Sequence, residues 1–313
     1  MKKLALVTVT YNAEKNLSFF LPSLIKNRDS IDAVYFVDNC SSDTTLETLT
    51  LFKNEGTLVV PLEIIANTKN YGYTYAINKG IQKALDDGFD YICVTNNDII
   101  FDEGFMSTFL EDAKREKTDA LGVPASINSK DVGLGYRLDT VRYLPKKDGS
   151  IKREDLAAKS IQNQTLSIDF PHGGTILFSR FFFEEVGMYD HHLFFGGDEL
   201  DFLYRVTAYN AVHDVSIKCA VSLRAFFLMD NLSKHNTSHK ITKAKRMLQG
   251  NARVNLKHRF TPLQLGLYKE QQALIRDLSK DSPLRYIALY LFAFRGLCIE
   301  ILKYYISPVT KKI

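Results

Sequence analysis

The feature that most constrains this chain is the alternation of short apolar runs and helix-forming segments over its first 100 residues. β-branched and aromatic side chains dominate the runs, and a segment with helical spacing follows each of the first three. The predicted strands are residues 4–9, 33–37, 62–66 and 91–95, and the predicted helices are residues 14–26, 42–52 and 73–86. Strands that alternate with helices form βαβ units, so we expect an α/β fold with a mainly parallel, doubly wound sheet.

Polar residues follow each predicted strand at the point where it ends. The four loops are Thr10-Tyr11-Asn12, Asp38-Asn39, Asn67 to Gly72, and Asn96-Asn97-Asp98. Open α/β sheets bind ligands at the carboxyl ends of their strands, so we expect these loops to meet at one crevice. Taken alone, the last loop favours a simple turn, because Asn and Asp side chains bond their own backbone.

Length, cysteine spacing and charge limit the class of protein. A chain of 313 residues can bury a substantial core, and its four cysteines are spaced singly, which suits a reducing cytoplasm better than a zinc site or a disulfide framework. The apolar start is interrupted at Tyr11-Asn12, too early for a signal peptide, so we interpret it as the first strand. The net charge is only +4, but residues 234–259 are rich in Lys, Arg and His without any acidic residue, which indicates an anionic partner.

The later part of the chain is less regular. Residues 126–168 are polar with little periodicity, so we expect a solvated loop or flexible lid there. Residues 283–306 mix aromatic, aliphatic and charged side chains, which suits an interfacial or docking helix more than a membrane span. We therefore divide the chain into a catalytic domain, residues 1–230 with an acceptor half at 169–230, and a basic helical region at 231–313.

Five segments in order carry a family resemblance. They are VTVTYNAEKNL, VDNCSSDTT, NTKNYGYTYAINKGI, VTNNDI and GGTILFSRFFFEEVGMYDHHLFFGGDELDF, which together span about residues 4–210. In these segments the chain resembles the inverting nucleotide-sugar glycosyltransferases of the GT-A fold, glycosyltransferase family 2. It looks most like the bacterial rhamnosyl- and galactofuranosyltransferases of surface polysaccharides. The resemblance implies a dTDP- or UDP-sugar donor and a saccharide acceptor, which is often lipid-linked.

The resemblance also implies which residues bind the nucleotide. They are Thr10, Tyr11, Asn12, Asp38, Asn70, Gly72, Asn78 and Asn97. For Asp38 the alternative is an Asx turn that starts a helix. Glycine at positions 72 and 80 permits close backbone approach to a ligand, but Gly80 is equally compatible with a tight helix contact.

A metal site is implied at Asp98, because Asn96-Asn97-Asp98 stands where the family has its Asp-x-Asp motif. A divalent ion such as Mn²⁺ or Mg²⁺ prefers oxygen ligands and neutralises the charge of a diphosphate leaving group. Asn96 replaces the first carboxylate and weakens the site. No His lies at the spacing of the family's further metal ligand, which weakens it again.

Acidic residues near position 200 fit the need for a general base. The family's Glu-Asp pair aligns with Asp198-Glu199, which makes Glu199 the expected base and Asp198 its substitute, with Asp201 beside them. The alternative is an acidic helix N-terminus stabilised by the helix dipole, and both can hold. His172, Gly173 and Gly174 precede an inner strand and are expected on the donor or acceptor side.

Other classes of function compete with this interpretation. A non-catalytic nucleotide-sugar-binding subunit would keep the fold and lose the chemistry. A dinucleotide-dependent oxidoreductase is disfavoured because no GxGxxG follows the first strand. Nucleic-acid binding rests only on the basic segment 234–259, which suits phosphate or membrane lipid better. We expect a cytoplasmic enzyme, with the C-terminal region either contacting the inner face of the membrane or pairing two subunits.

Overall fold

The structure is a computed structural model that describes residues 3–123, 125–128, 131–133, 135–137, 142–143, 151–152, 165–171, 173–225, 227–229, 246–247, 249–250, 253–254 and 257–258. Its main sheet contains β1 (Leu4–Thr10), β2 (Ala33–Asp38), β3 (Leu62–Ala66), β4 (Tyr91–Thr95), β6 (Ala120–Gly122), β12 (Thr165–Ser167), β14 (Thr175–Ser179) and β15 (Cys219–Ser222). The helices are α1 (Glu14–Ile25), α2 (Thr45–Glu55), α3 (Tyr73–Asp86), α4 (Phe105–Glu116), α6 (Arg180–Glu185) and α7 (Asp198–Asn210).

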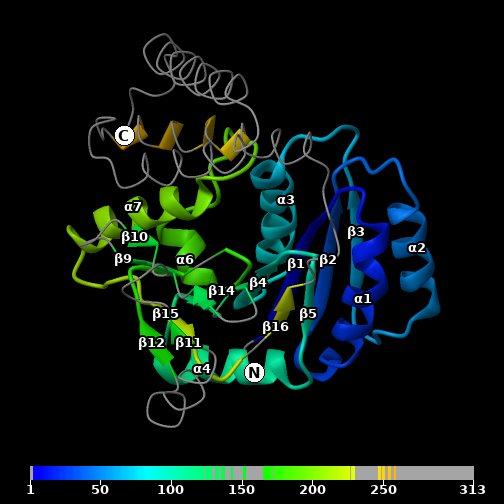
Figure 1. The fold of residues 1–313 in the computed structure, drawn as a ribbon, viewed down its shortest axis with the longest axis horizontal. Helices are drawn as coiled ribbons and strands as arrows, with labels where there is room; N and C mark the ends of the chain where they lie inside the picture. Colours follow the sequence, from blue (N-terminus) through cyan, green and yellow to red (C-terminus); the bar gives the residue numbers. More distant parts are fainter. Residues whose placement is uncertain are drawn as a thin grey trace.

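The eight strands follow the order β12-β15-β6-β14-β4-β1-β2-β3 (Figure 1). Neighbouring strands from β4 to β3 are parallel, whereas β14 runs antiparallel to both β4 and β6. The chain moves outward from β1 through β2 to β3 and then returns to place β4 on the other side of β1. This reversal creates a topological switch point between β1 and β4, which is where open α/β sheets bind ligands.

The side chains of β1 are buried on both faces of the sheet. Leu4 and Leu6 belong to the core that α1, α2 and α4 share, while Ala5 and Val7 belong to the core on the α3, α6 and α7 side. Helices therefore cover both faces of the sheet, as expected for parallel strands. The predicted α/β architecture is confirmed.

Helix α3 approaches β1 closely at Gly80. A Cβ on Gly80 would meet the side chain of Val7 below any normal contact distance and would lie 3.0 Å from Val37 Cγ2. Gly80 therefore serves the tight helix contact that the sequence offered as an alternative, rather than a ligand.

Two sequence-based expectations need correction. The helix predicted from Ser42 begins at Thr45. Asp43 Oδ1 accepts hydrogen bonds from Thr45 N at 3.1 Å and from Thr45 Oγ1 at 2.5 Å, so Asp43 belongs to the turn before the helix. Residues 126–168 were predicted as a loop, but their described part forms short strands. These are β7 (Ala125–Asn128), β8 (Asp131–Gly133), β9 (Gly135–Arg137), β10 (Arg142–Tyr143), β11 (Ile151–Lys152) and β12. Antiparallel pairing satisfies their backbone without an apolar pattern, which is why periodicity missed them.

The remaining short strands are β5 (Ile99–Phe101), β13 (Phe170–Pro171) and β16 (Phe227–Met229). Strand β5 pairs with β16, and β13 pairs with β9. Every helix within the described part of the chain is too short or too polar to cross a lipid bilayer. The helix predicted at 283–306 lies outside the described residues.

Candidate active site

The carboxyl ends of β1 and β2 form the first part of the site. Thr10 Oγ1 donates to Asp38 Oδ1 at 3.1 Å, and Ser41 N donates to Asp38 Oδ2 at 3.0 Å. Asp38 therefore bonds the backbone of the segment that leads to α2, three residues further on, and it also meets Thr10 at the edge where the two loops were expected to converge. Tyr11, next to this pair, is 51% exposed, so its ring is open to a ligand.

Two asparagines tie the loops at the switch point together. Asn97 Nδ2 donates to Val9 O at 2.7 Å, and Asn97 Oδ1 accepts from Asn16 Nδ2 at 2.7 Å, so Asn97 spans β4, β1 and α1. Asn12 has φ of 50°, and its Oδ1 accepts from Ser42 N at 2.8 Å. Both predicted nucleotide residues thus join neighbouring segments at the carboxyl ends of the strands.

Asn39 is the centre of a polar network that the sequence did not identify as a site. Its amide donates to Asn70 Oδ1 at 3.0 Å and to Gly72 O at 3.1 Å, while its Oδ1 accepts from Asn67 Nδ2 at 3.2 Å. Lys79 Nζ then donates to Asn67 Oδ1 at 2.7 Å. The only sequence signal was the position of Asn39 directly after Asp38 at a strand end.

Gly72 joins this network to the loop before α7. Its φ is 93°, and a Cβ there would lie 2.7 Å from Phe194 O, so no side chain fits. Tyr73 N donates to Phe194 O at 2.8 Å, and Thr74 Oγ1 donates to Leu193 O. The glycine that the sequence assigned to ligand approach therefore also permits close packing of two loops.

Asn78 has a structural role in this arrangement. Its Nδ2 donates to Tyr189 O at 2.8 Å, and its Oδ1 accepts from Tyr189 N at 3.1 Å. These bonds fix the segment that leads to the turn at 190–193 against α3, and its nucleotide contact stays a prediction.

Asp98 and the acidic start of α7 both affect the Tyr73 phenol. Burial, and then the charges of Asp198, Glu199 and Asp98, raise the pKa of this phenol well above its ordinary value. The predicted metal ligand and the predicted base lie in segments far apart in the sequence, but their charges influence the same side chain. Tyr73 was not among the predicted site residues.

The two carboxyl groups that start α7 differ in their surroundings. Glu199 Oε1 accepts a hydrogen bond from Gly173 N at 2.8 Å, which orients the carboxylate. Burial, followed by the negative charge of Glu199, raises the pKa of Asp198 to about 7. A carboxyl group that titrates near neutral pH, beside a second one held in place, is suited to accept a proton in a reaction.

The other residues predicted near this pair have different outcomes. Gly173 lies against Glu199, and Gly174 O accepts from Asn96 N at 3.0 Å, which joins the start of β14 to the end of β4. His172 lies outside the described residues.

Asp201 is fully buried and bonded to two cationic side chains and one imidazole. Its Oδ2 accepts from Arg205 Nε at 2.9 Å, and its Oδ1 accepts from Lys257 Nζ at 2.8 Å and His258 Nε2 at 2.9 Å. Burial opposes ionisation, but these hydrogen bonds and charges hold the pKa of Asp201 well below its usual range. The structure thus places Asp201 inside the protein, one helical turn from the carboxyl pair.

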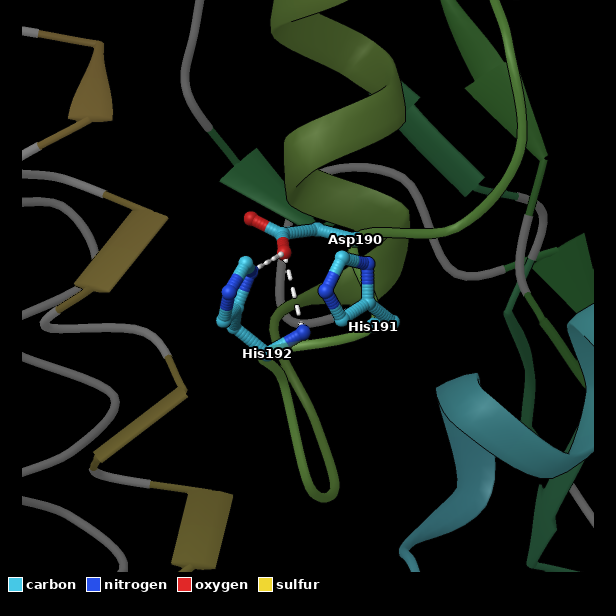
Figure 2. Close-up of side chains that lie close together, drawn as sticks. All are labelled: Asp190, His191 and His192. Atoms are coloured by element: carbon cyan, nitrogen blue, oxygen red, sulfur yellow. Dashed lines mark hydrogen bonds and ion pairs between the residues drawn. The ribbon is translucent and has the colours of Figure 1, made fainter. Parts of the chain in front are cut away.

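Figure 2 shows Asp190, His191 and His192 with potential metal-ligand atoms within 4.8 Å of one another. Asp190 Oδ1 accepts from His192 N and from His192 Nδ1, both at 3.0 Å. Its Oδ2 lies 3.4 Å from Lys257 Nζ and 3.6 Å from Arg253 Nε. Because these cations already compensate the carboxylate, we assign the cluster to the structure of the turn and not to a metal.

Comparison with known proteins identifies the family of this chain. The family model described as Glycosyl transferase family 2 matches residues 5–187. The chain belongs to glycosyl transferase family 2. It is therefore a glycosyltransferase. The match includes the four predicted strand-end loops and ends before Asp198 and Glu199.

Among solved structures, this glycosyltransferase is similar to the mannosyltransferase PcManGT from Pyrobaculum calidifontis. The TM-score is 0.53 at 14% identity, with 98% of this chain and 88% of the other chain covered. S. aureus TarS 1–349 is aligned with a TM-score of 0.49 at 16% identity, over 97% of this chain and 91% of that chain. A comparison with curated protein sequences gives no match. The family and the mannosyltransferase likeness establish the GT-A fold.

Proposed function

We propose that this glycosyltransferase moves a sugar from a nucleoside-diphosphate donor to an acceptor hydroxyl with inversion of the anomeric centre. The observation that carries the proposal is a pair of neighbouring contacts: Gly173 N donates to Glu199 Oε1, and Asn96 N donates to Gly174 O, so the acidic start of α7 is joined to the end of β4, which Asp98 follows. A diphosphate, an anomeric carbon and an attacking hydroxyl need these groups in one place.

The reaction breaks one bond and forms one. The acceptor oxygen forms a bond to the anomeric carbon, while the bond from that carbon to the diphosphate oxygen breaks and its electron pair leaves with the nucleoside diphosphate. The hydroxyl proton passes to a carboxylate of the enzyme. A single displacement of this kind inverts the anomeric configuration, so one base is sufficient.

Glu199 is the proposed base, since the Gly173 N–H fixes the direction of its carboxylate. Asp198 is its partner and the alternative base, because its pKa of about 7 allows it to take up a proton near neutral pH. The positive end of the α7 dipole helps to hold the two negative charges side by side.

Asp98 is the proposed ligand for Mn²⁺ or Mg²⁺. The donor set fits a hard cation, because Asp98 supplies carboxylate oxygen and the diphosphate supplies further oxygen ligands. When bound, the ion would stabilise the charge that develops on the leaving diphosphate. The structurally similar mannosyltransferase is described in complex with GDP-Man and Mn²⁺, which supports the general chemistry. Asn97 supports the metal site indirectly, because its amide bonds to β1 and α1 and so holds the loop that carries Asp98.

The donor is proposed as a dTDP- or UDP-sugar of the rhamnose or galactofuranose type, from the resemblance of the ordered motifs. The proposed acceptor is a saccharide, often lipid-linked, in cell-surface polysaccharide synthesis. Peripheral membrane contact or dimerisation through residues 231–313 stays a prediction.

A panel of dTDP-, UDP- and GDP-sugars tests the function. We expect release of nucleoside diphosphate that requires Mn²⁺ or Mg²⁺ and rises on adding a saccharide acceptor, with an inverted anomeric linkage seen by NMR. A retained configuration would refute the single-displacement chemistry. Tight donor binding without turnover on any acceptor, including water, would favour the non-catalytic subunit.

A further inference from the structure

Described residues of the basic segment 234–259 lie beside α7 in Figure 1, and several of them contact α7 or the loop that leads into it. Those that contact this loop or α7 are Arg246, Met247, Gly250, Arg253, Lys257 and His258, and we call them the C-terminal latch. Arg253, Lys257 and His258 contact acidic side chains of the catalytic domain, so these three basic residues find their partners inside the protein.

Lys257 connects the two ends of the loop. Its Nζ lies 3.4 Å from Asp190 Oδ2, at the turn shown in Figure 2, and 2.8 Å from Asp201 Oδ1, inside α7. His258 Nε2 donates to the same Asp201 oxygen at 2.9 Å, and Arg253 Nε lies 3.6 Å from Asp190. Asp201 is fully buried, so these contacts are shielded from solvent and are stronger than surface ion pairs.

Close backbone packing accompanies the ion pairs. A Cβ on Gly250 would lie 2.9 Å from Gly196 C and 3.1 Å from Phe195 O, so only glycine allows this approach. A Cβ on Gly196 would in turn lie 3.0 Å from Met247 Cγ. Arg246 stacks over the Phe194 ring at 4.1 Å. The latch therefore contacts the loop at residues 194–196 as well as at both of its ends.

The loop held in this way runs directly into the carboxyl groups of Asp198 and Glu199. We propose that Lys257 and His258 are positioning residues, which hold Asp201 and thereby set the place of Asp198 and Glu199 at the start of α7. This inference deepens the proposed function and rests on it, since the positioned groups are the proposed base and its partner.

The donor half of the site has its own supports. Thr10 bonds to Asp38, Asn97 bonds to Val9 O, and Asn39 bonds to Asn70. These bonds involve neither Lys257 nor the loop at 190–197, so they keep the nucleotide loops in place when the latch is lost. Loss of the latch lysine is expected to lower turnover and to leave nucleotide affinity nearly unchanged.

Full-length Lys257→Met is the test variant, because methionine keeps the length of the side chain and removes its charge. We expect amides of residues 194–201 to exchange with deuterium at least about tenfold faster, because exchange follows the free energy of local opening. We also expect kcat to fall about ten- to a hundredfold, the scale of a misplacement of about 1 Å, with nucleoside diphosphate affinity changed less than about twofold. Lys257→Arg keeps a cation and is expected to restore most of both properties.

Lys114→Met on α4 is the matched control, since it removes an exposed lysine far from Asp201 in the sequence. Exchange at 194–201 that stays unchanged in Lys257→Met would overturn the proposal. A uniform rise in exchange over the whole domain, with kcat lost only in proportion to unfolded protein, would overturn it as well. If the wild-type protein transfers no sugar from any donor, the proposed function fails, while the exchange experiment still decides whether the latch holds the loop.

Discussion

Gly173→Ala is the sharpest single test of the proposed base, because the Glu199 side chain occupies the space that a Cβ at position 173 would need. A Cβ at position 173 would lie 2.9 Å from Glu199 Cδ and closer still to Oε1, whereas ordinary contact begins at 3.4 Å. The backbone of Gly173 has no positive φ, so alanine is not strained there. The added methyl group therefore acts on Glu199 and not on the backbone.

The magnitude follows from the displacement. The carboxylate carbon of Glu199 must move by about 0.5 Å to reach ordinary contact distance, and its oxygen must move further. A misplacement of about 1 Å lowers the rate of a reaction by about a hundredfold. The same movement weakens the bond from Gly173 N, and a hydrogen bond to a charged group contributes about 1.5–3 kcal/mol. Both routes lead to a loss of about ten- to a hundredfold in kcat, since each factor of ten corresponds to about 1.4 kcal/mol.

The assay compares turnover with folding stability. Gly173→Ala is expected to lower kcat with little change in donor affinity and in the free energy of unfolding, because a Glu side chain can swing aside. Gly80→Ala is the contrasting variant, since its Cβ would enter the core at Val7 and lower the free energy of unfolding by about 1–3 kcal/mol. Unchanged kcat in Gly173→Ala would show that the position of Glu199 does not matter and would refute the assignment.

Three further predictions concern the carboxyl groups. Glu199→Gln is expected to keep donor binding and to lower the rate of transfer by about a hundredfold or more. Asp198→Asn is expected to lower the rate of transfer less. If steady-state assays gave the reverse order, the base would be Asp198. Asp98→Ala is expected to abolish the extra affinity for nucleoside diphosphate that Mn²⁺ or Mg²⁺ confers. If calorimetry on the wild type gave equal affinity with and without EDTA, Asp98 would be only a turn residue. The pKa of Asp198, raised to about 7, predicts that kcat/KM falls as pH drops below about 7 and that Asp198→Asn moves this fall to lower pH. Because the folded state holds this proton when the unfolded chain has lost it, stability is expected to decline as pH rises from about 4 to about 7, and Asp198→Asn should flatten that decline in thermal melts.

Local pattern was sufficient for the elements of the first 100 residues. The strands at Leu62–Ala66 and Tyr91–Thr95 and the helix at Tyr73–Asp86 have the predicted bounds, because apolar runs, helical spacing and polar strand ends are properties of neighbouring residues. The order of motifs also led to the family that the comparison confirms. The convergence of Thr10 and Asp38 at one edge followed from parallel strand geometry alone.

Tertiary structure decided what the individual polar residues do. Asn78 was expected at the nucleotide, but it bonds the backbone of Tyr189, which lies far along the chain. Tyr73 was missed because the carboxylates that raise the pKa of its phenol come from two segments far from it in the sequence. In the same way, a basic segment without acidic residues suggested an external anionic partner, whereas Lys257 and His258 find their anion in Asp201, buried in the catalytic domain. Charge in a sequence indicates that a partner is needed, but only the fold shows whether that partner lies inside the protein, because burial and distance determine which charges interact.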